Sequence, residues 1–114
     1  MKKKRVGLIK GKKKLNLDVF DCNFLEKGIG LMFSREKNAK ILAFRFKNKS
    51  HLSIHSFFVF FPFIAVWTDD KNRVISYKIV KPFSFYIAPP RNGFFNMFEI
   101  PMTKKHSRVV KSFK

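Results

Sequence analysis

The feature that most constrains the fold is a series of short apolar segments, rich in aromatic and β-branched residues, between positions 41 and 100. Asn, Asp, Ser, Gly and Pro residues, which favour turns, separate one segment from the next. Segments of five to nine residues at this spacing are typical of antiparallel sheets rather than of alternating parallel units. We therefore expect a mainly β protein, a small antiparallel β-sandwich or barrel. The expected strands span residues 41–46, 53–61, 64–68, 73–80, 83–88 and 94–100.

The region before these segments predicts two further short strands and one helix. Residues 6–9 are flanked by lysines, which favours at most an edge strand, and apolar residues alternate with polar ones over residues 15–20. Apolar residues at helical spacing follow over residues 25–33, and Asp21 is placed to cap the first turn. One short helix is therefore expected near the N-terminus, over residues 22–34. On the later hairpin, Trp67 and Tyr77 flank a turn and are expected to pair across it.

Positive charge is concentrated at the two ends of the chain. The formal net charge is +18, and residues 1–14 and 101–114 together hold 13 of the 25 basic residues and no acidic residue. We therefore expect three parts: a basic N-terminal segment (1–14), a single β domain (15–101) and a basic C-terminal segment (102–114).

Clustered lysines bind phosphate groups electrostatically, in nucleic acid or at an anionic membrane surface, although lysine runs also occur as simple solvated ends. Arginine, which reads base edges well, is scarce, so sequence-specific recognition is not expected. The leading hypothesis is a non-catalytic binding module whose basic ends contact a polyanion such as nucleic acid without sequence specificity. The candidate polyanion-binding residues are Lys2, Lys3, Lys4, Arg5, Lys12, Lys13, Lys14, Lys104, Lys105 and Arg108.

Composition also limits the class of protein. A chain that is 46% hydrophobic and 17% aromatic is too apolar for intrinsic disorder. Its longest apolar run, residues 57–67, contains Pro62 and is shorter than the roughly 20 residues that a membrane-spanning helix needs. The basic N-terminus lacks the apolar stretch of a secretory signal, and the single cysteine, Cys22, excludes an internal disulfide. We expect a cytoplasmic protein without a transmembrane segment.

No residue pattern in this sequence predicts a catalytic site, a metal site or a cofactor. His51 and His55 are four residues apart, but on a strand this spacing separates them by roughly 13 Å, too far to share a metal ion. Cys22 begins the predicted helix, where a thiol is activated, yet a lone cysteine is more often a small buried apolar residue. Asp69 and Asp70 lie in a turn that favours Asp for backbone reasons. Enzyme activity is therefore the least favoured interpretation.

An alternative function uses the aromatic residues instead of the basic ends. The Phe-rich strand and Trp67 would line a concave apolar cleft that binds a small ligand or another protein, with polar contacts from Glu99, Lys81 and His55. Core packing is the competing explanation for most of the phenylalanines. The candidate cleft residues are His55, Phe57, Phe58, Trp67, Lys81 and Glu99.

Several motifs occur in an order shared with a known family. The segment EKGIGLMFSR is followed by SIHSFFVFFPFIAVWTDDKNRVISYKIVKPF and then by a strand ending in FEIP. This order resembles the domain of unknown function 192 family of archaea and bacteria, over residues 15–101. The matching positions are Gly30, Leu31, Met32, His55, Phe57, Phe58, Pro62, Asp69, Lys81, Pro82 and Glu99.

Two departures from that family are visible. Ile64 stands where the family commonly has an Asp, and the residues after Pro101 lack the family's Gly-Asp segment. The resemblance implies a compact, mostly β domain of sandwich-like architecture. It implies no reaction, because the activity of the family is uncharacterised and a fold alone does not define a function.

Overall fold

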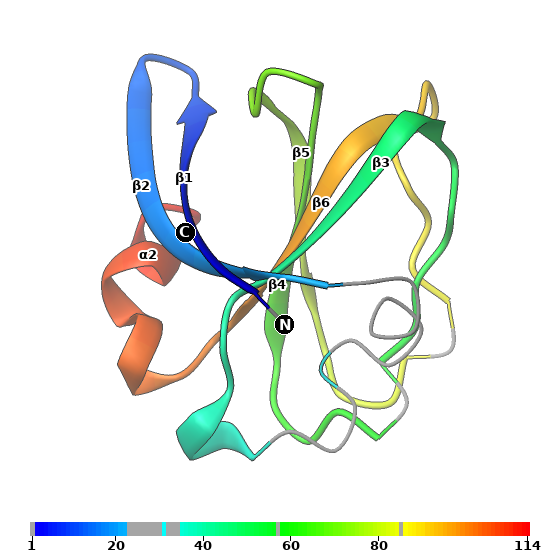
Figure 1. Cartoon of the computed structure of the whole chain (residues 1–114). Helices are drawn as coiled ribbons and strands as arrows, with labels where there is room; N and C mark the ends of the chain where they lie inside the picture. Colours follow the sequence, from blue (N-terminus) through cyan, green and yellow to red (C-terminus); the bar gives the residue numbers. More distant parts are fainter. Residues whose placement is uncertain (1, 23–30, 32–34, 57, 85) are drawn as a thin grey trace.

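The computed structural model describes residues 2–22, 31, 35–56, 58–84 and 86–114, which fold around one six-stranded sheet (Figure 1). The strand order is β1-β2-β3-β6-β4-β5, so β1 and β5 are the two edges. The prediction of a mainly β protein is therefore confirmed. The strands are β1 (Lys2–Lys10), β2 (Lys13–Asp21), β3 (Leu42–Ser50), β4 (Phe63–Thr68), β5 (Val74–Val80) and β6 (Phe94–Pro101).

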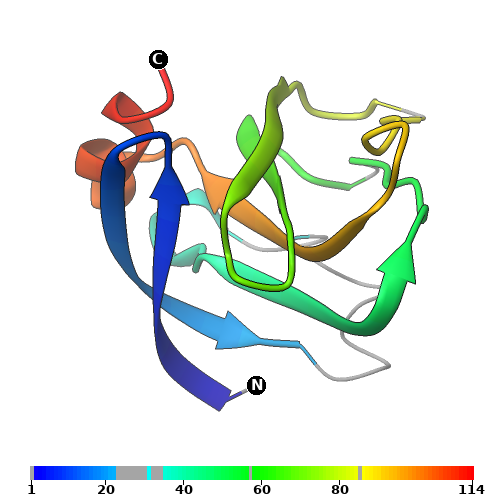
Figure 2. The ribbon, with the colours of Figure 1, turned by 90° about the horizontal axis from the view of Figure 1, so that it is seen from above.

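The sheet is strongly curved and forms a half-barrel (Figure 2). Neighbouring strands run antiparallel, except that β2 and β3 run parallel where Phe20 lies beside Leu42. The curvature brings the end of β1 close to the turn before β5, where the Ile9 amide donates a 2.9 Å hydrogen bond to the Asn72 carbonyl. The two edge strands thus approach each other at one end of the half-barrel.

Apolar side chains cover both faces of the sheet, which explains why every residue of β4 is buried. Alternate residues of a strand point to opposite faces, so β4 contributes to two separate clusters. The first, the helix-side core, contains Val6, Leu8, Leu17, Val19, Ile41, Ala43, Ile64, Val66, Phe98, Ile100, Val110 and Phe113. The second, the loop-side core, contains Cys22, Leu31, Ala39, Leu42, Phe44, Val59, Phe61, Phe63, Ala65, Trp67, Val80, Ile87, Phe94 and Met97.

The short α-helix of the described residues, α2 (Ser107–Lys111), lies near the C-terminus, where no helix was expected from the sequence. Val110 and Phe113 anchor this segment because both side chains are buried in the helix-side core. Two short 3₁₀ turns, η1 (Glu36–Asn38) and η2 (Lys104–His106), lie before β3 and before α2. In the part of the chain that the structure describes, no helix has the length and apolar character needed to cross a membrane.

The helix predicted over residues 22–34 falls largely outside the described residues. Two of its positions are described, Cys22 and Leu31, and both side chains are buried in the loop-side core. The interpretation of Cys22 as a small buried apolar residue is therefore confirmed.

Two of the expected strands do not form. The described parts of residues 53–61 and 83–88 adopt turns and irregular structure, connected by an isolated β-bridge. The buried Ser56 explains this difference, because its hydroxyl donates a 2.7 Å hydrogen bond to the Lys81 carbonyl and accepts one of 2.6 Å from the Ser84 amide. These bonds fix two chain reversals side by side in place of a strand ladder.

The basic ends of the chain form part of the folded structure, in β1 and in the η2–α2 segment. The N-terminal lysines belong to β1, which pairs with β2 from Lys2 opposite Asp21 to Lys10 opposite Lys13. The predicted edge position of this segment is confirmed, but the strand is longer than expected. The reason is that Val6 supplies an apolar face that alternates with the basic side chains. Both basic ends are therefore held at fixed places on the sheet.

Candidate polyanion-binding site

A pocket of about 400 Å³ opens beside the N-terminal hairpin and the C-terminal helix. Four basic side chains line it: Lys3 from β1, Lys40 from the segment before β3, Lys105 from η2 and Arg108 from α2. Among its described lining residues, Asp18 of β2 is the one carboxylate. We call this site the basic pocket. Its other described lining residues are Asn16, Leu17, Phe20, Ile41, His106 and Val109.

The N-terminal hairpin positions Lys3 through the two-residue period of β-strands. Val6 and Leu8 point into the helix-side core, so Lys3 and Arg5 lie on the opposite face of β1. In the register of the hairpin, Lys3 lies directly opposite Phe20. The alternation in β1 therefore places Lys3 on the same face of the hairpin as Phe20, another lining residue of the pocket.

The C-terminal segment is fixed by one hydrogen bond and one apolar anchor. His106 Nε2 lies 2.8 Å from the carbonyl oxygen of Ala39, so this ring nitrogen donates to the segment that leads into β3. Val110 is buried in the helix-side core. These two contacts place Lys105 and Arg108 beside the basic residues of the hairpin, although almost the whole chain separates them in sequence.

The positive charge of the basic pocket is only weakly compensated by the protein itself. The ion pairs that the structure describes join Arg45 to Asp21 and Arg73 to Asp69, and neither involves a lining residue of the pocket. Lys40 Nζ lies 4.5 Å from the centroid of the Phe20 ring, so this cation packs on an aromatic face and not on a carboxylate. A dense group of cations in a concave site attracts anions.

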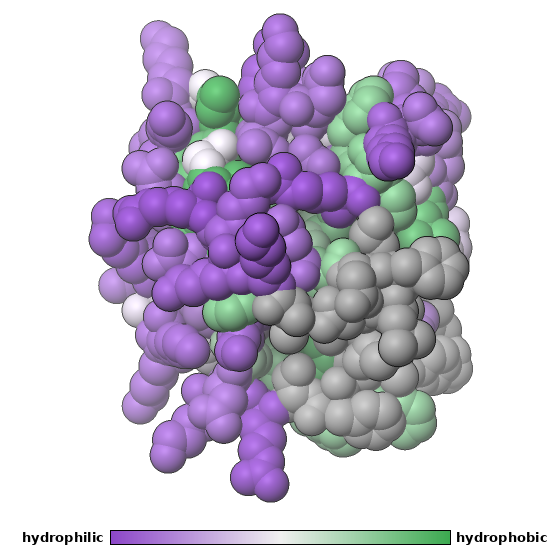
Figure 3. Space-filling model, in the orientation of Figure 1, coloured by the Kyte–Doolittle hydropathy of each residue, from purple (hydrophilic) through white to green (hydrophobic). Residues whose placement is uncertain are grey.

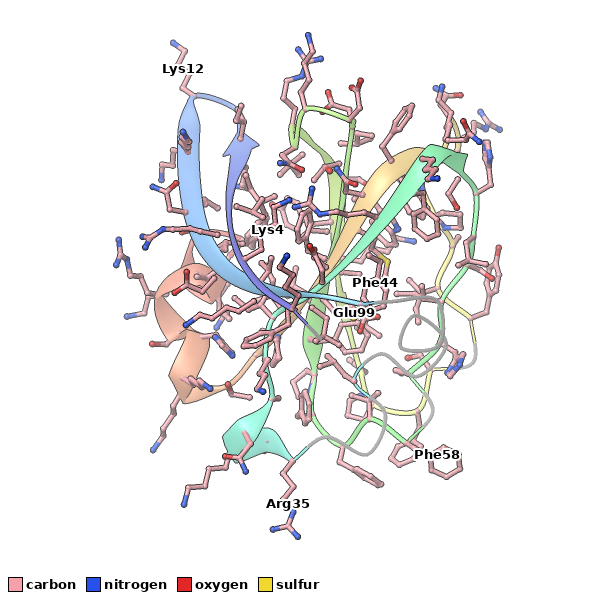
Figure 4. All side chains as sticks on the ribbon, in the orientation of Figure 1. Lys4, Lys12, Arg35, Phe44, Phe58 and Glu99 are labelled. Carbon is pink, nitrogen blue, oxygen red and sulfur yellow. The ribbon has the colours of Figure 1, made fainter. Side chains whose placement is uncertain are left out.

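The remaining basic residues predicted for polyanion binding lie outside the basic pocket, and all of them are exposed. In Figure 4, Lys12 projects from the tip of the hairpin, while Lys4 lies further along the same hairpin. Figure 3 shows hydrophilic side chains gathered over β1, β2 and α2. Outside the pocket are Lys2, Lys4, Arg5, Lys12, Lys13, Lys14 and Lys104.

Two pocket residues could not be found from the sequence. Lys40 belongs to the central part of the chain, where basic residues are mixed with acidic ones, and His106 has no distinguishing neighbours. Lys40 is adjacent to Ala39, the acceptor of the His106 hydrogen bond, so the fold brings these positions together. Only the folded arrangement of η2 against the start of β3 identifies them.

Five of the six candidate residues of the aromatic cleft are described, and they fall into two groups. Trp67 and Glu99 are buried in the interior, where Figure 4 shows Glu99 near Phe44, whereas His55, Phe58 and Lys81 are exposed. Phe57 lies outside the described residues. The binding of a ligand by these residues stays a prediction.

Glu99 is the unusual residue of that set, because its carboxyl group is enclosed by the sheet and the loop-side core. It lies between Leu42 of β3 and Ala65 of β4. Burial raises its pKa to about 8, although a hydrogen bond from the Leu31 amide acts in the opposite direction. Within the described residues, Glu99 Oε1 and the indole nitrogen of Trp67 have no hydrogen-bond partner. A neutral carboxyl group at pH 7 limits the cost of this burial.

Comparisons of sequence with known proteins give one distant relative. No family model matches the chain. A UPF0127 protein of Pyrococcus horikoshii is 28% identical over 69 residues, an alignment that covers 60% of this chain and 60% of the relative. The match thus spans less than two thirds of the relative's length. This distant relative is itself a member of an uncharacterised family.

Two crystal structures have a similar fold. A proposed transcription regulator from Sinorhizobium meliloti has a TM-score of 0.78 and 18% identity, covering 96% of this chain and 87% of its own. A protein of unknown function from Novosphingobium aromaticivorans has a TM-score of 0.72 and 12% identity, covering 95% of this chain and 79% of its own. At these identities the similarity establishes the fold alone.

Proposed function

We propose that this protein is a non-catalytic binding module that contacts a polyanion, nucleic acid in particular, without sequence specificity. The observation that carries the proposal is that Lys3, Lys40, Lys105 and Arg108, from four separate elements, line one pocket with a single described carboxylate. A folded chain that holds like charges together in a concavity must offset their repulsion. A bound phosphate group would do so directly.

The composition of the site favours contacts to the phosphate backbone rather than to base edges. Three of the four cations are lysines, which act as compact point charges, whereas base readout in the major groove relies mainly on bidentate arginine, asparagine or glutamine. Phosphate contacts position a protein on nucleic acid and carry no sequence information. The proposed binding is therefore electrostatic and strongly dependent on salt.

The test is fluorescence anisotropy with a labelled duplex of mixed sequence, titrated with protein between about 50 and 200 mM salt. For the wild type we expect a linear fall of log affinity with log salt. The Lys3→Ala/Arg108→Ala variant loses two phosphate contacts, so the slope becomes shallower by about 1.8 units, since each contact contributes ~0.9. The control is Lys47→Ala/Lys49→Ala, which removes the same charge from exposed positions on β3.

Each outcome of this experiment bears on the proposal. An equal loss of affinity in both double variants would mean that total charge and not the basic pocket governs binding. Failure of the wild type to bind at about 50 mM salt would remove the proposed function altogether.

A second candidate function, binding of a small ligand, is favoured by the buried pair Trp67 and Glu99. Trp67 belongs to the loop-side core, and Glu99 lies opposite Leu42 and Ala65 of the same core. Each has a polar atom without a partner in the described residues. Buried polar atoms normally have partners, which a bound molecule or water would supply. Ligand-induced shifts in thermal unfolding that disappear in Trp67→Phe would support this candidate.

Two narrower assignments belong to the same proposal. The motif order supports membership of the domain of unknown function 192 family, and the UPF0127 relative supports an uncharacterised family of that kind. A cytoplasmic location is consistent with a binding partner that is nucleic acid, and cell fractionation tests it.

A further inference from the structure

A second pocket, of about 420 Å³, lies along the open edge of β5. On one side is the end of β5, from Lys78 to Val80, and on the other side is the irregular segment that returns after the turn at Lys81. It shares no described lining residue with the basic pocket. We call it the β5 pocket. Its described lining residues are Lys78, Ile79, Val80, Lys81, Ser84, Tyr86, Ile87 and Ala88.

The shape of the β5 pocket is held by hydrogen bonds and not by a strand ladder. The Phe83 amide donates a 2.9 Å hydrogen bond to the Ser56 carbonyl, and the Ser84 hydroxyl donates one of 2.9 Å to the Lys81 carbonyl. Phe83 adopts φ +60°, a left-handed conformation that is unfavourable for a bulky side chain. The surrounding bonds enforce this conformation, so the wall of the pocket is preorganised.

The lining of the β5 pocket includes an exposed aromatic ring, that of Tyr86. Tyr86 is 67% exposed, and no ring contact of Tyr86 occurs among the described residues. Outside the lining of this pocket, Phe60 and Phe83 pack edge to face with centroids 5.4 Å apart and remain 60% and 47% exposed. In the basic pocket, by contrast, the ring of Phe20 is covered by Lys40. A base can therefore stack at the β5 pocket but not on Phe20.

Basic side chains accompany these rings. Lys78 and Lys81 are exposed, and the described lining of the β5 pocket contains no carboxylate. An aromatic platform beside lysines is the arrangement by which proteins hold single-stranded nucleic acid, with bases on rings and phosphates on cations. The volume lies within the range of pockets that take small organic ligands.

We propose that the β5 pocket binds one nucleotide of a single-stranded nucleic acid, with the base stacked on Tyr86 and phosphates contacted by Lys78 and Lys81. This inference rests on the proposed function and adds to it a preference for single strands. The physical reason is that bases in a duplex are stacked on each other and cannot lie flat on a protein ring. A duplex would use the basic pocket, whereas a single strand would also use the β5 pocket.

The experiment compares a labelled oligothymidylate with a duplex of the same length at constant salt, using the intact chain. In Tyr86→Leu we expect affinity for the oligothymidylate to fall about tenfold, because stacking on an aromatic face is lost. Affinity for the duplex stays unchanged. Tyr86→Phe retains the ring and should bind both as the wild type does. Phe58→Leu is the matched control, because this exposed ring does not line the β5 pocket.

The two proposals fail in distinguishable ways. If neither oligonucleotide binds, both the proposed function and this inference are wrong. If both bind but Tyr86→Leu matches the wild type, or weakens duplex and single strand equally, only the inference is wrong. A further outcome would also overturn the inference. If Tyr86→Leu bound anionic phospholipid vesicles more weakly than the wild type but bound oligothymidylate equally well, the exposed ring would belong to a membrane-binding surface.

Discussion

His106 and Ala39 are joined by a hydrogen bond of 2.8 Å between the imidazole Nε2 and the backbone carbonyl oxygen, across 67 positions of sequence. This contact ties η2 to the segment that leads into β3. Lys105 precedes His106, and Lys40 follows Ala39, so the bond brings together two cations that line the basic pocket. A single hydrogen bond thus maintains the geometry of a charged site.

His106→Ala should therefore weaken duplex binding without removing a lysine or an arginine. Loss of the hydrogen bond is expected to cost about 1 kcal/mol of stability, because the Ala39 carbonyl loses its donor. Urea denaturation and anisotropy titration measure the two effects. The control is His51→Ala at an exposed position. Unchanged affinity in a folded His106→Ala protein would show that η2 holds its place without this bond.

Glu99→Gln should stabilise the protein above neutral pH. The pKa of the carboxyl is about 8 in the folded state against an ordinary value of 4.5, because burial penalises the charged form. Between these values the unfolded state loses its proton first, so wild-type stability falls with rising pH, by up to ~1.4 kcal/mol per pH unit. Below about pH 4.5 both states are protonated, and the slope from this group vanishes.

The measurement is chemical denaturation of wild type and Glu99→Gln at a series of pH values from 4 to 9. Because Gln is neutral throughout, the advantage of the variant should grow as the pH rises to about 8 and then level off. Glu36→Gln, at an exposed position in η1, is the control for a general change of charge. A constant difference between Glu99→Gln and wild type across this range contradicts the expectation.

Gly93→Ala should be more destabilising than Gly11→Ala, although both glycines have positive φ, +81° and +61°. At Gly93 a Cβ atom would lie 2.8 Å from the Ser50 carbonyl oxygen and 2.7 Å from Lys49 Cγ, whereas at Gly11 nothing lies within 4 Å. Gly11→Ala therefore carries only the conformational cost, about 1–2 kcal/mol. The melting temperatures of the two variants measure this difference. Equal melting temperatures would mean that the backbone around Ser50 shifts to accommodate the methyl group without loss of stability.

The sequence predicted those strands whose signals are local. Residues 64–68, 73–80 and 94–100 combine apolar runs with strong turn residues at their ends, and they correspond to β4, β5 and β6. Residues 53–61 have an equally apolar composition but form no strand in their described part. The difference comes from Ser56, whose hydrogen bonds reach residues more than twenty positions away. Such contacts leave no periodic signal.

The pairing register of β4 and β5 also could not be predicted from the sequence pattern. Trp67 and Tyr77 were expected to pair across their hairpin, but Trp67 lies opposite Ser76 and Tyr77 lies opposite Val66. A register irregularity between Trp67 and Thr68 accompanies this offset. A shift of one residue moves a side chain to the other face of a sheet, so the two rings occupy different sides.

For the candidate site, the sequence identified the charge but not its arrangement. Lys3, Lys105 and Arg108 were among the predicted residues because they belong to acid-free ends. That these ends and Lys40 line the same pocket depends on pairing of β2 with β3 and packing of α2 on the helix-side core. Long-range packing of this kind cannot be read from composition.

Phe113→Ala tests whether the C-terminal segment stabilises the half-barrel at its open side. The Phe113 ring is 2% exposed and packs edge to face on Tyr77 of β5, with centroids 5.1 Å apart, while Lys10 Nζ of β1 lies 5.6 Å from its centroid. One ring thus contacts both edge strands. Truncation leaves a cavity, and we expect a loss of about 3–5 kcal/mol in the free energy of unfolding.

The control is Ile75→Ala, at a 48% exposed position on β5, which should change the free energy of unfolding by about 0.5 kcal/mol or less. Because the Phe113 ring contacts Tyr77 of β5 and Lys10 of β1, hydrogen exchange should become faster in α2 and at the β1 and β5 edges together. Faster exchange confined to α2 would show that Phe113 anchors only the C-terminal segment.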